Sequence, residues 1–333
     1  MPTTLVTGGA GFMGTHLAAE LLAMGHRVVV LDDLSGGTRD NVPARAELAH
    51  GSVVDHDYVD RLFTRQRFDY VFHLAAYAAE GLSHFIKRYN YTTNLLGSVN
   101  VINAAVNAGT VRCFVFTSSI AVYGPGQVPM VESTMPRPID PYGIAKYAVE
   151  LDLDEARQVF ALDFVVFRPH NVYGERQNIG DRYRNVIGIF MSQILRGEPM
   201  TIFGDGEQTR AFTHVSDVTP LIARSVERPA TWNQVFNVGA DLPCTVNHLA
   251  KEVARAMGVE PRVVHLDART EVQHAFCDHS KARAAFGDLV KGVTLEAGLA
   301  RTASWVRKVG ARKTGALAGL EVTKNLPPSW LGD

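Results

Sequence analysis

Short, continuously apolar segments alternate with amphipathic segments through the first half of the chain. Five of the apolar segments are rich in β-branched and aromatic residues, as strands buried on both faces are, namely 4–8, 27–33, 70–76, 113–119 and 164–170. Between them, 15–25 and 94–109 have the apolar spacing of helices, and each ends on a glycine, which tolerates the left-handed conformation that commonly follows a helix. This alternation predicts βαβ units and an α/β fold with a doubly wound parallel sheet.

The pattern loosens from about residue 171, where loops rich in Gly, Arg and Asp separate shorter helices. The segment 234–239 again has the pattern of a sheet strand, so we expect the smaller, C-terminal substrate lobe to be discontinuous. The expected larger lobe is 1–170 with a returning segment near 213–240, and the expected smaller lobe is 171–212 with 241–310. The tail, 311–333, has weak periodicity and a Pro-Pro break, so no structure is predicted for it.

Composition narrows the function classes. The chain has 333 residues, with 33 Lys and Arg against 34 Asp and Glu, and a net charge of -1 gives no general attraction to nucleic acid or to anionic membranes. The cysteines, Cys113, Cys244 and Cys277, are far apart, which argues against a zinc site or a disulfide framework and favours a reducing compartment. The chain has no leader pattern and no apolar run of about 18 residues. We therefore expect a cytoplasmic protein without metal, membrane or nucleic-acid partners.

The stretch TGGAGFMG places Gly8, Gly11 and Gly14 between the first predicted strand and the first predicted helix. A dinucleotide pyrophosphate needs close approach to the backbone and to the N–H groups at a helix N-terminus, which side chains here would block. Asp32 ends the second strand, about twenty residues further on, where a carboxylate can accept from both hydroxyls of the adenine ribose. Because that carboxylate would repel the 2′-phosphate of NADP, the motif predicts NAD as the cofactor. The alternative is a structural turn beside a solvated acid.

The stretch DPYGIAKYAVE places Tyr142 and Lys146 four residues apart, on one face of a predicted helix. Upstream, the strand in 113–119 ends in hydroxyl side chains, the last of which is Ser119. A phenol is a poor base at neutral pH, but a nearby ammonium and a cationic cofactor would favour its phenolate. These residues therefore suit proton and hydride transfer at a carbinol, with Ser119 sharing the reacting oxygen. A surface Tyr–Lys pair is the alternative.

The motifs TGGAGFMG, HLAA, TSSIAVYG, YGIAK and GDGEQTRAFTHVSD, in this order, resemble the extended short-chain dehydrogenase/reductase superfamily, and within it the nucleotide-sugar epimerases of the UDP-glucose 4-epimerase type. The resemblance runs from about residue 3 to residue 281. It implies a Rossmann-type NAD-binding lobe, tightly bound NAD, a nucleotide-sugar lobe and a homodimer.

Residue roles follow from this resemblance by matching motifs. It implies Tyr142 as the catalytic base, with Lys146 and Ser119 as its helpers. The cofactor-binding positions it implies are Gly8, Gly11, Phe12, Met13, Gly14, Asp32, Leu74, Ala75, Ala76, Asn94, Tyr142 and Lys146, with His73 in the same strand wall. The substrate-binding positions are Ser119, Tyr142, Asn171, Asn185, Val186, Arg210 and Arg269. Among these, Arg210 is expected on the diphosphate, because a guanidinium fork suits phosphate oxygens.

Departures from related motifs select the reaction. In the similar motif of the 4,6-dehydratases, an Asp-Glu pair follows the catalytic hydroxyl residue, and in that of the uronate decarboxylases a Glu follows it. At these positions this chain has Ile120 and Ala121. We therefore predict NAD-dependent epimerisation at C4 of a UDP-hexose or UDP-hexuronate through a 4-keto intermediate. The alternatives are a GDP-sugar epimerase of the 3,5-epimerase type, a nucleotide-sugar reductase, or a noncatalytic NAD-sensing protein on the same fold.

Several positions leave their roles open. Ser52 stands where the family usually has an acid near the adenine, and His170 replaces the usual aromatic residue beside the sugar, where it either meets a polar substituent or packs. Four basic residues could either recognise the carboxylate of a uronate substrate or simply be solvated, and we favour solvation. These basic residues are Lys87, Arg88, Arg182 and Arg184.

Overall fold

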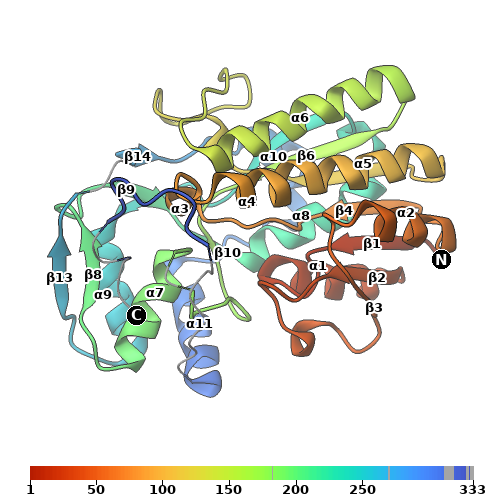
Figure 1. Cartoon of the computed structure of the whole chain (residues 1–333). Helices are drawn as coiled ribbons and strands as arrows, with labels where there is room; N and C mark the ends of the chain where they lie inside the picture. Colours follow the sequence, from red (N-terminus) through yellow and green to blue (C-terminus); the bar gives the residue numbers. More distant parts are fainter. Residues whose placement is uncertain (182, 269–270, 311–318, 328–329, 331–333) are drawn as a thin grey trace.

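The computed structural model describes residues 1–181, 183–268, 271–310, 319–327 and 330. A parallel sheet of seven strands forms its centre, in the order β11-β6-β5-β4-β1-β2-β3 (Figure 1). The strands are β1 (Thr3–Thr7), β2 (Arg27–Asp32), β3 (Glu47–His50), β4 (Tyr70–His73), β5 (Cys113–Thr117), β6 (Phe164–Pro169) and β11 (Gln234–Val238). The chain order reverses between β1 and β4, which in a doubly wound sheet opens a crevice at the carboxyl ends of the strands.

Helices cover both faces of this sheet because successive strand residues point to opposite sides. Leu5, Val29 and Phe114 belong to a buried cluster with one group of helices, whereas Val6 and Val30 belong to a second cluster with the other group. The first group is α2 (His56–Arg65), α5 (Gly97–Ala108) and α6 (Pro141–Phe160), and the second is α1 (Phe12–Ala23), α8 (Thr219–Arg224) and α10 (Ser280–Phe286). The predicted α/β fold with a doubly wound parallel sheet is confirmed.

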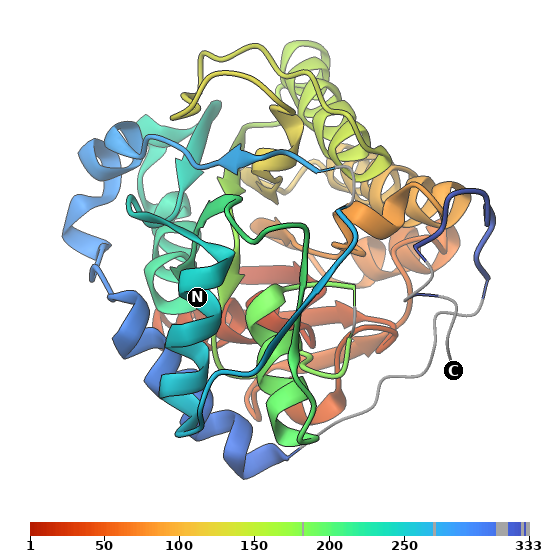
Figure 2. The same cartoon turned by 90° about the vertical axis from the view of Figure 1, so that its left-hand side faces the viewer.

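The smaller lobe lies beside the carboxyl ends of the strands, on the left of Figure 1 and facing the viewer in Figure 2. Its helices are α7 (Val186–Leu195), α9 (Val246–Met257) and α11 (Leu295–Val309), which pack around a core of their own. Short strands complete it: β7 (Val172–Tyr173) pairs with β10 (Thr213–His214), β8 (Met200–Phe203) with β13 (Val263–Leu266), and β9 (Thr209–Ala211) with β12 (Pro243–Thr245) and β14 (His274–Ala275).

Local signals account for the ends of the helices next to the crevice. Gly109 ends α5 with a φ of 61°, in the left-handed conformation. Asp140 caps α6, because its carboxylate accepts from the N–H of Gly143 at 2.8 Å, and Pro141 occupies the first helical position. The Tyr142–Lys146 face is therefore fixed from the first turn of α6.

Some elements differ from the sequence-based expectations. The edge strand β3 was not predicted, because it is short and half-exposed. Helix α10 lies within 241–310, yet Ala282 and Phe286 pack against the large sheet. The short helices α3 (Glu80–Ser83) and α4 (Lys87–Tyr91) and a π-helical turn (Thr92–Leu96) precede α5. Within the part of the chain that the structure describes, no helix is long and apolar enough to cross a membrane.

Candidate active site

A cavity of about 1620 Å³ lies between the two lobes, at the carboxyl ends of the sheet strands. It is lined by the glycine loop and the ends of β2, β4 and β5 on one side, and by residues of α7, β8 and β9 on the other. Sixteen of the predicted site residues line it: Gly8, Gly11, Phe12, Met13, Gly14, Asp32, Leu74, Ala75, Ala76, Ser119, Tyr142, Lys146, Asn171, Asn185, Val186 and Arg210. The sheet thus brings together residues that are far apart in the sequence.

The glycine loop leaves no room for side chains. A Cβ on Gly8, which has a φ of +69°, would lie 2.8 Å from the Cα of Ala75. A Cβ on Gly14 would lie 2.1 Å from the carbonyl oxygen of Gly8, so α1 could not pack this close to the loop. The loop leads into the N-terminus of α1, where the first N–H groups of a helix are available to an anion. This arrangement fits the pyrophosphate of a dinucleotide.

Asp32 lies at the end of β2, beside the glycine loop. Its carboxylate accepts from the backbone N–H of Ala10 at 2.9 Å and from that of Leu34 at 2.8 Å. Burial raises the pKa of Asp32, and these backbone hydrogen bonds oppose that rise. The neighbouring Asp33 also lines the cavity, and Ser52, which stands where an acid was expected, donates to it at 3.2 Å. Two carboxylates therefore face this end of the cavity.

Tyr142 and Lys146 lie on the buried face of α6, next to the end of β5. The Lys146 ammonium donates to the carbonyl of Thr117 at 2.8 Å and lies 5.8 Å from the centroid of the Tyr142 ring. Ser119, just after β5, lines the same cavity as Tyr142. Burial raises the pKa of Tyr142. Burial lowers the pKa of Lys146 to about 7, and the carboxylate of Glu150 opposes that fall.

Glu150, one turn after Lys146, is held by a buried ion pair that sequence reasoning missed. Arg168 on β6 donates from Nε to Oε1 of Glu150 at 2.9 Å and from Nη2 to Oε2 at 2.5 Å, and Ser118 donates to Oε1 at 2.5 Å. A third guanidinium nitrogen donates to the hydroxyl of Tyr123 at 2.7 Å. The ion pair joins α6 to β6 and keeps a carboxylate near Lys146.

Two predicted residues lie outside the cavity lining. Asn94 is buried, accepts from the N–H of Tyr77 at 2.8 Å and donates to Asn90, which in turn donates to the carbonyl of Pro141. Asn94 therefore supports the start of α6 from behind. His73 hydrogen-bonds to Thr7 and Ser98, and burial lowers its pKa to about 3, so it is a neutral packing residue.

The predicted substrate residues lie at the second-lobe side of the cavity. Asn171, with a φ of 42°, donates to the carbonyl of Ala211 at 3.2 Å, and Asn185 caps α7 by accepting from the N–H of Ile187. The guanidinium of Arg210 donates to main-chain carbonyls of 272–273 and lies 3.6 Å from a carboxylate oxygen of Glu271. Arg269, like Arg182, lies outside the described residues.

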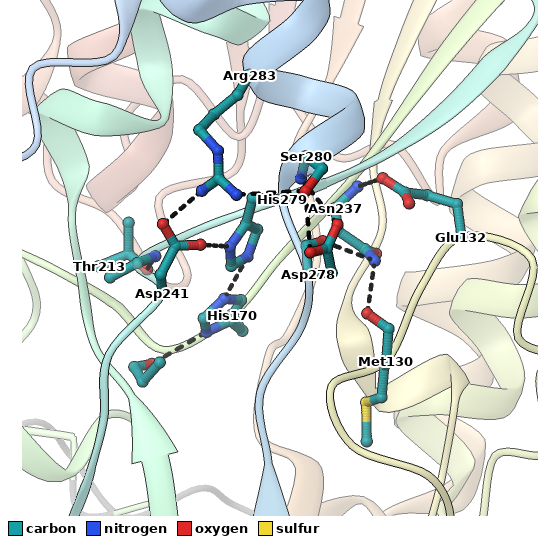
Figure 3. Close-up of polar contacts among 12 residues, drawn as sticks. Met130, Glu132, His170, Thr213, Asn237, Asp241, Asp278, His279, Ser280 and Arg283 are labelled. Atoms are coloured by element: carbon teal, nitrogen blue, oxygen red, sulfur yellow. Dashed lines mark hydrogen bonds and ion pairs between the residues drawn. The ribbon is translucent and has the colours of Figure 1, made fainter.

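His170 does not line the cavity, and its ring points toward His279 (Figure 3). Its Nδ1 lies 3.0 Å from the carbonyl oxygen of Ala211, and its Nε2 lies 2.9 Å from Nε2 of His279. The other ring nitrogen of His279 lies 2.8 Å from Asp241, which also pairs with Arg283. Of the two roles left open for His170, these contacts favour the packing role.

Sequence reasoning missed several residues that face the cavity. Arg184, for which solvation was favoured, packs over the Tyr77 ring at 4.4 Å and pairs with Asp181 at 2.9 Å. Arg176 donates to the hydroxyl of Thr15 on α1 at 2.7 Å. Trp330, from the tail, also lines the cavity. No periodic or motif signal marks these positions, because their partners are remote in sequence.

Comparisons with known proteins agree with this geometry. A family model described as the NAD dependent epimerase/dehydratase family matches residues 4–239. UDP-glucose 4-epimerase of Mycolicibacterium smegmatis is 36% identical over 313 residues, which cover 91% of this chain and 98% of that protein.

Two solved structures have the same fold. One is UDP-glucose 4-epimerase of Thermotoga maritima with UDP-glucose, with a TM-score of 0.88 and 36% identity over 92% of this chain and 99% of that chain. The other is UDP-glucuronic acid 4-epimerase of Bacillus cereus with UDP-glucuronic acid and NAD, with a TM-score of 0.84 and 26% identity over 92% of this chain and 99% of that chain. The glycine loop, the Tyr142–Lys146 helix and these matches together place the chain in the NAD dependent epimerase/dehydratase family.

Proposed function

We propose that the protein is an NAD-dependent enzyme that inverts the configuration at C4 of a UDP-sugar, either a UDP-hexose or a UDP-hexuronate. The observation that carries the proposal is the position of Tyr142, Ser119 and Lys146 between a dinucleotide loop and a second-lobe pocket. The relatives named UDP-glucose 4-epimerase and the structures with UDP-glucose or UDP-glucuronic acid support the substrate class.

In this proposal, Tyr142 removes the proton of the C4 hydroxyl, and Ser119 hydrogen-bonds to the same oxygen. The cationic form of Lys146 favours the Tyr142 phenolate, because an opposite charge within a few ångströms stabilises the charged form. The bound NAD supplies the hydride acceptor, and later the donor, for C4. After the first transfer the sugar is a 4-keto compound, which must present its opposite face before Tyr142 returns the proton.

The residues around Ser119 favour this reaction over related ones. The similar motifs of the 4,6-dehydratases and the uronate decarboxylases have an acidic side chain just after the catalytic hydroxyl residue. Here Ile120 and Ala121 follow it, and Ala121 is buried. Asp32 and Asp33 both face the ribose end of the cavity, which disfavours NADPH and hence a reductase. An NAD-sensing protein would have no need of Ser119, Tyr142 and Lys146 together.

We assign the remaining roles by position. The glycine loop, Asp32 and 74–76 hold NAD in this proposal, with Asn94 acting through the start of α6. Asn171, Asn185, Val186 and Arg210 hold the nucleotide diphosphate from the second lobe, which we take as 171–212 with 241–310, apart from α10, which packs against the large sheet. The first lobe is 1–170 with 213–240.

We also infer a homodimer in the cytoplasm. Apolar side chains are exposed on the outer face of α6: Ile144 is 42% exposed, Leu151 is 55% exposed and Val159 is 61% exposed. Such a row on one helix is suited to pairing with a second copy.

All three cysteines are free thiols, which is consistent with a reducing compartment.

A substrate labelled with deuterium at C4 tests the reaction. UDP-glucose and UDP-glucuronic acid are each supplied deuterated at C4, and the one that is the substrate should give its C4 epimer with the label still on C4 and without accumulation of NADH. Migration of the label from C4 to C6 would instead indicate a dehydratase. Uptake of solvent deuterium at C3 or C5, with unlabelled substrate in D2O, would indicate deprotonation at carbon of the 3,5-epimerase type.

A further inference from the structure

Residues 319–327 belong to the tail, for which the sequence predicts no structure, and they run near α3 (Figure 1, dark blue). They lie beside α3 and α4 and are anchored there by Glu321. The Glu321 carboxylate accepts from the backbone N–H of Arg88 at 2.7 Å and from that of Tyr89 at 2.9 Å, in the first turns of α4. The backbone N–H groups of Glu321 and Val322 donate to the carbonyl of Phe85 at 2.8 and 3.2 Å.

Beyond this anchor, Trp330 packs between aromatic residues of two separate segments. Its ring centroid lies 5.9 Å from that of Phe85, next to α3, and 5.2 Å from that of Tyr183, in the loop before α7. Both neighbours meet the indole nearly at right angles, at 84° and 83°, so neither covers it in a parallel stack. The indole is half-buried and lines the same cavity as Tyr142 and Ser119.

The neighbours of Trp330 place it at the end of the cavity where Tyr142 lies. The indole Cη2 is 3.5 Å from the position that a Cβ on Gly81 would occupy. Gly81 belongs to α3, which packs against α6, the helix that carries Tyr142. Arg210 and Asn185, in contrast, reach the cavity from β9 and α7 of the second lobe.

We propose that Trp330 is a substrate-binding residue that contacts the sugar, rather than the nucleotide, of the bound UDP-sugar; this inference rests on the proposed function. The indole offers a flat apolar surface, which suits the C–H face of a hexose, and Glu321 holds the tail that carries it. The tail lies outside the family match of 4–239, so this part of the sugar pocket is built from residues that the family model does not describe.

Calorimetry on the full-length, NAD-loaded protein tests the assignment, with UDP, UDP-glucose and UDP-glucuronic acid as ligands. Trp330→Ala should weaken binding of the UDP-sugar about tenfold and leave the affinity for UDP unchanged, because only the sugar contact is lost. Trp330→Phe should recover most of the affinity. Glu321→Gln should weaken UDP-sugar binding in the same direction, because it loosens the anchor.

Val322→Ala is the matched control, since this side chain is 41% exposed in the same tail and does not line the cavity; it should bind all ligands as the wild type does. Equal loss of UDP and UDP-sugar affinity in Trp330→Ala would contradict a sugar contact, and so would unchanged affinity for both. A wild-type protein that binds UDP-sugars but fails the deuterium experiment would contradict the proposed reaction and leave the Trp330 assignment standing.

Discussion

The ammonium of Lys146 lies 5.8 Å from the centroid of the Tyr142 ring, one turn away along α6, and the residue Lys146 as a whole is only 3% exposed. The position of the ammonium is fixed by the Thr117 carbonyl at the end of β5. Its charge is favoured by Glu150, which the Arg168 ion pair holds one turn further along the helix. The cation that is proposed to favour the Tyr142 phenolate is therefore itself maintained by a second buried charge pair.

The titration of Lys146 should be visible in the stability of the NAD-free protein. Its pKa is about 7 in the folded chain, against about 10.4 for an unperturbed lysine. Between these values the unfolded state holds a proton that the folded state lacks, so stability rises with pH. The free energy of unfolding of the wild type, relative to Lys146→Met, should therefore increase from pH 7 to pH 10 and stay level below pH 6. Urea unfolding at each pH measures this difference in the free energy of unfolding. A difference between wild type and Lys146→Met that does not change with pH would contradict the lowered pKa.

Replacement of the catalytic phenol should stop the reaction without unfolding the chain. Tyr142→Phe keeps the ring and removes the general base, which should lower kcat about 10²–10⁴-fold while NAD content and thermal stability stay close to those of the wild type. Tyr147→Phe, on the same helix but outside the cavity lining, is the control and should retain full activity. A Tyr142→Phe variant with normal turnover would exclude Tyr142 as the base.

The carboxylate of Asp32 should set the cofactor preference. We expect the wild type to bind NAD at least about a hundredfold more tightly than NADP, because like charges in contact cost several kcal/mol. Asp32→Asn should reduce the ratio of NAD affinity to NADP affinity. Asp40 is an exposed acid in the following turn and does not line the cavity, so Asp40→Asn should leave this ratio unchanged. Calorimetric titration of each protein with both dinucleotides measures the ratio. Equal wild-type affinities would overturn the role of Asp32.

The guanidinium of Arg210 should act on binding rather than on chemistry. A charge-assisted contact contributes about 2 kcal/mol, so Arg210→Ala should weaken UDP-sugar binding about thirtyfold. Unlike Trp330→Ala, it should weaken UDP to the same extent, because the diphosphate is common to both ligands. Arg262→Ala, which removes an exposed arginine of the same lobe, serves as the control. Unchanged affinity in Arg210→Ala would mean that β9 does not face the diphosphate.

Local sequence signals were sufficient for every strand of the large sheet except β3, and for the glycine loop and the Tyr142–Lys146 pair that line the cavity. Buried strands of a parallel sheet are apolar on both faces, so each can be recognised from its own residues, as β2 and β5 were. The glycines before α1 and the spacing of Tyr142 and Lys146 are likewise properties of one short segment. The parallel sheet then brings the ends of these segments to one edge.

What the tertiary structure alone decided are contacts between residues remote in sequence. His170 was recognisable as unusual, but only its position beside His279, 109 residues later, favours the packing role. The Glu150–Arg168 pair and the seat of Trp330 between Phe85 and Tyr183 depend in the same way on how distant segments pack. The sequence by itself determined the fold class, the dinucleotide loop and the Tyr–Lys pair, because each arises from local periodicity and spacing. The charges around Lys146 and the aromatic wall of the pocket arise only when separate elements meet, so they required the folded chain.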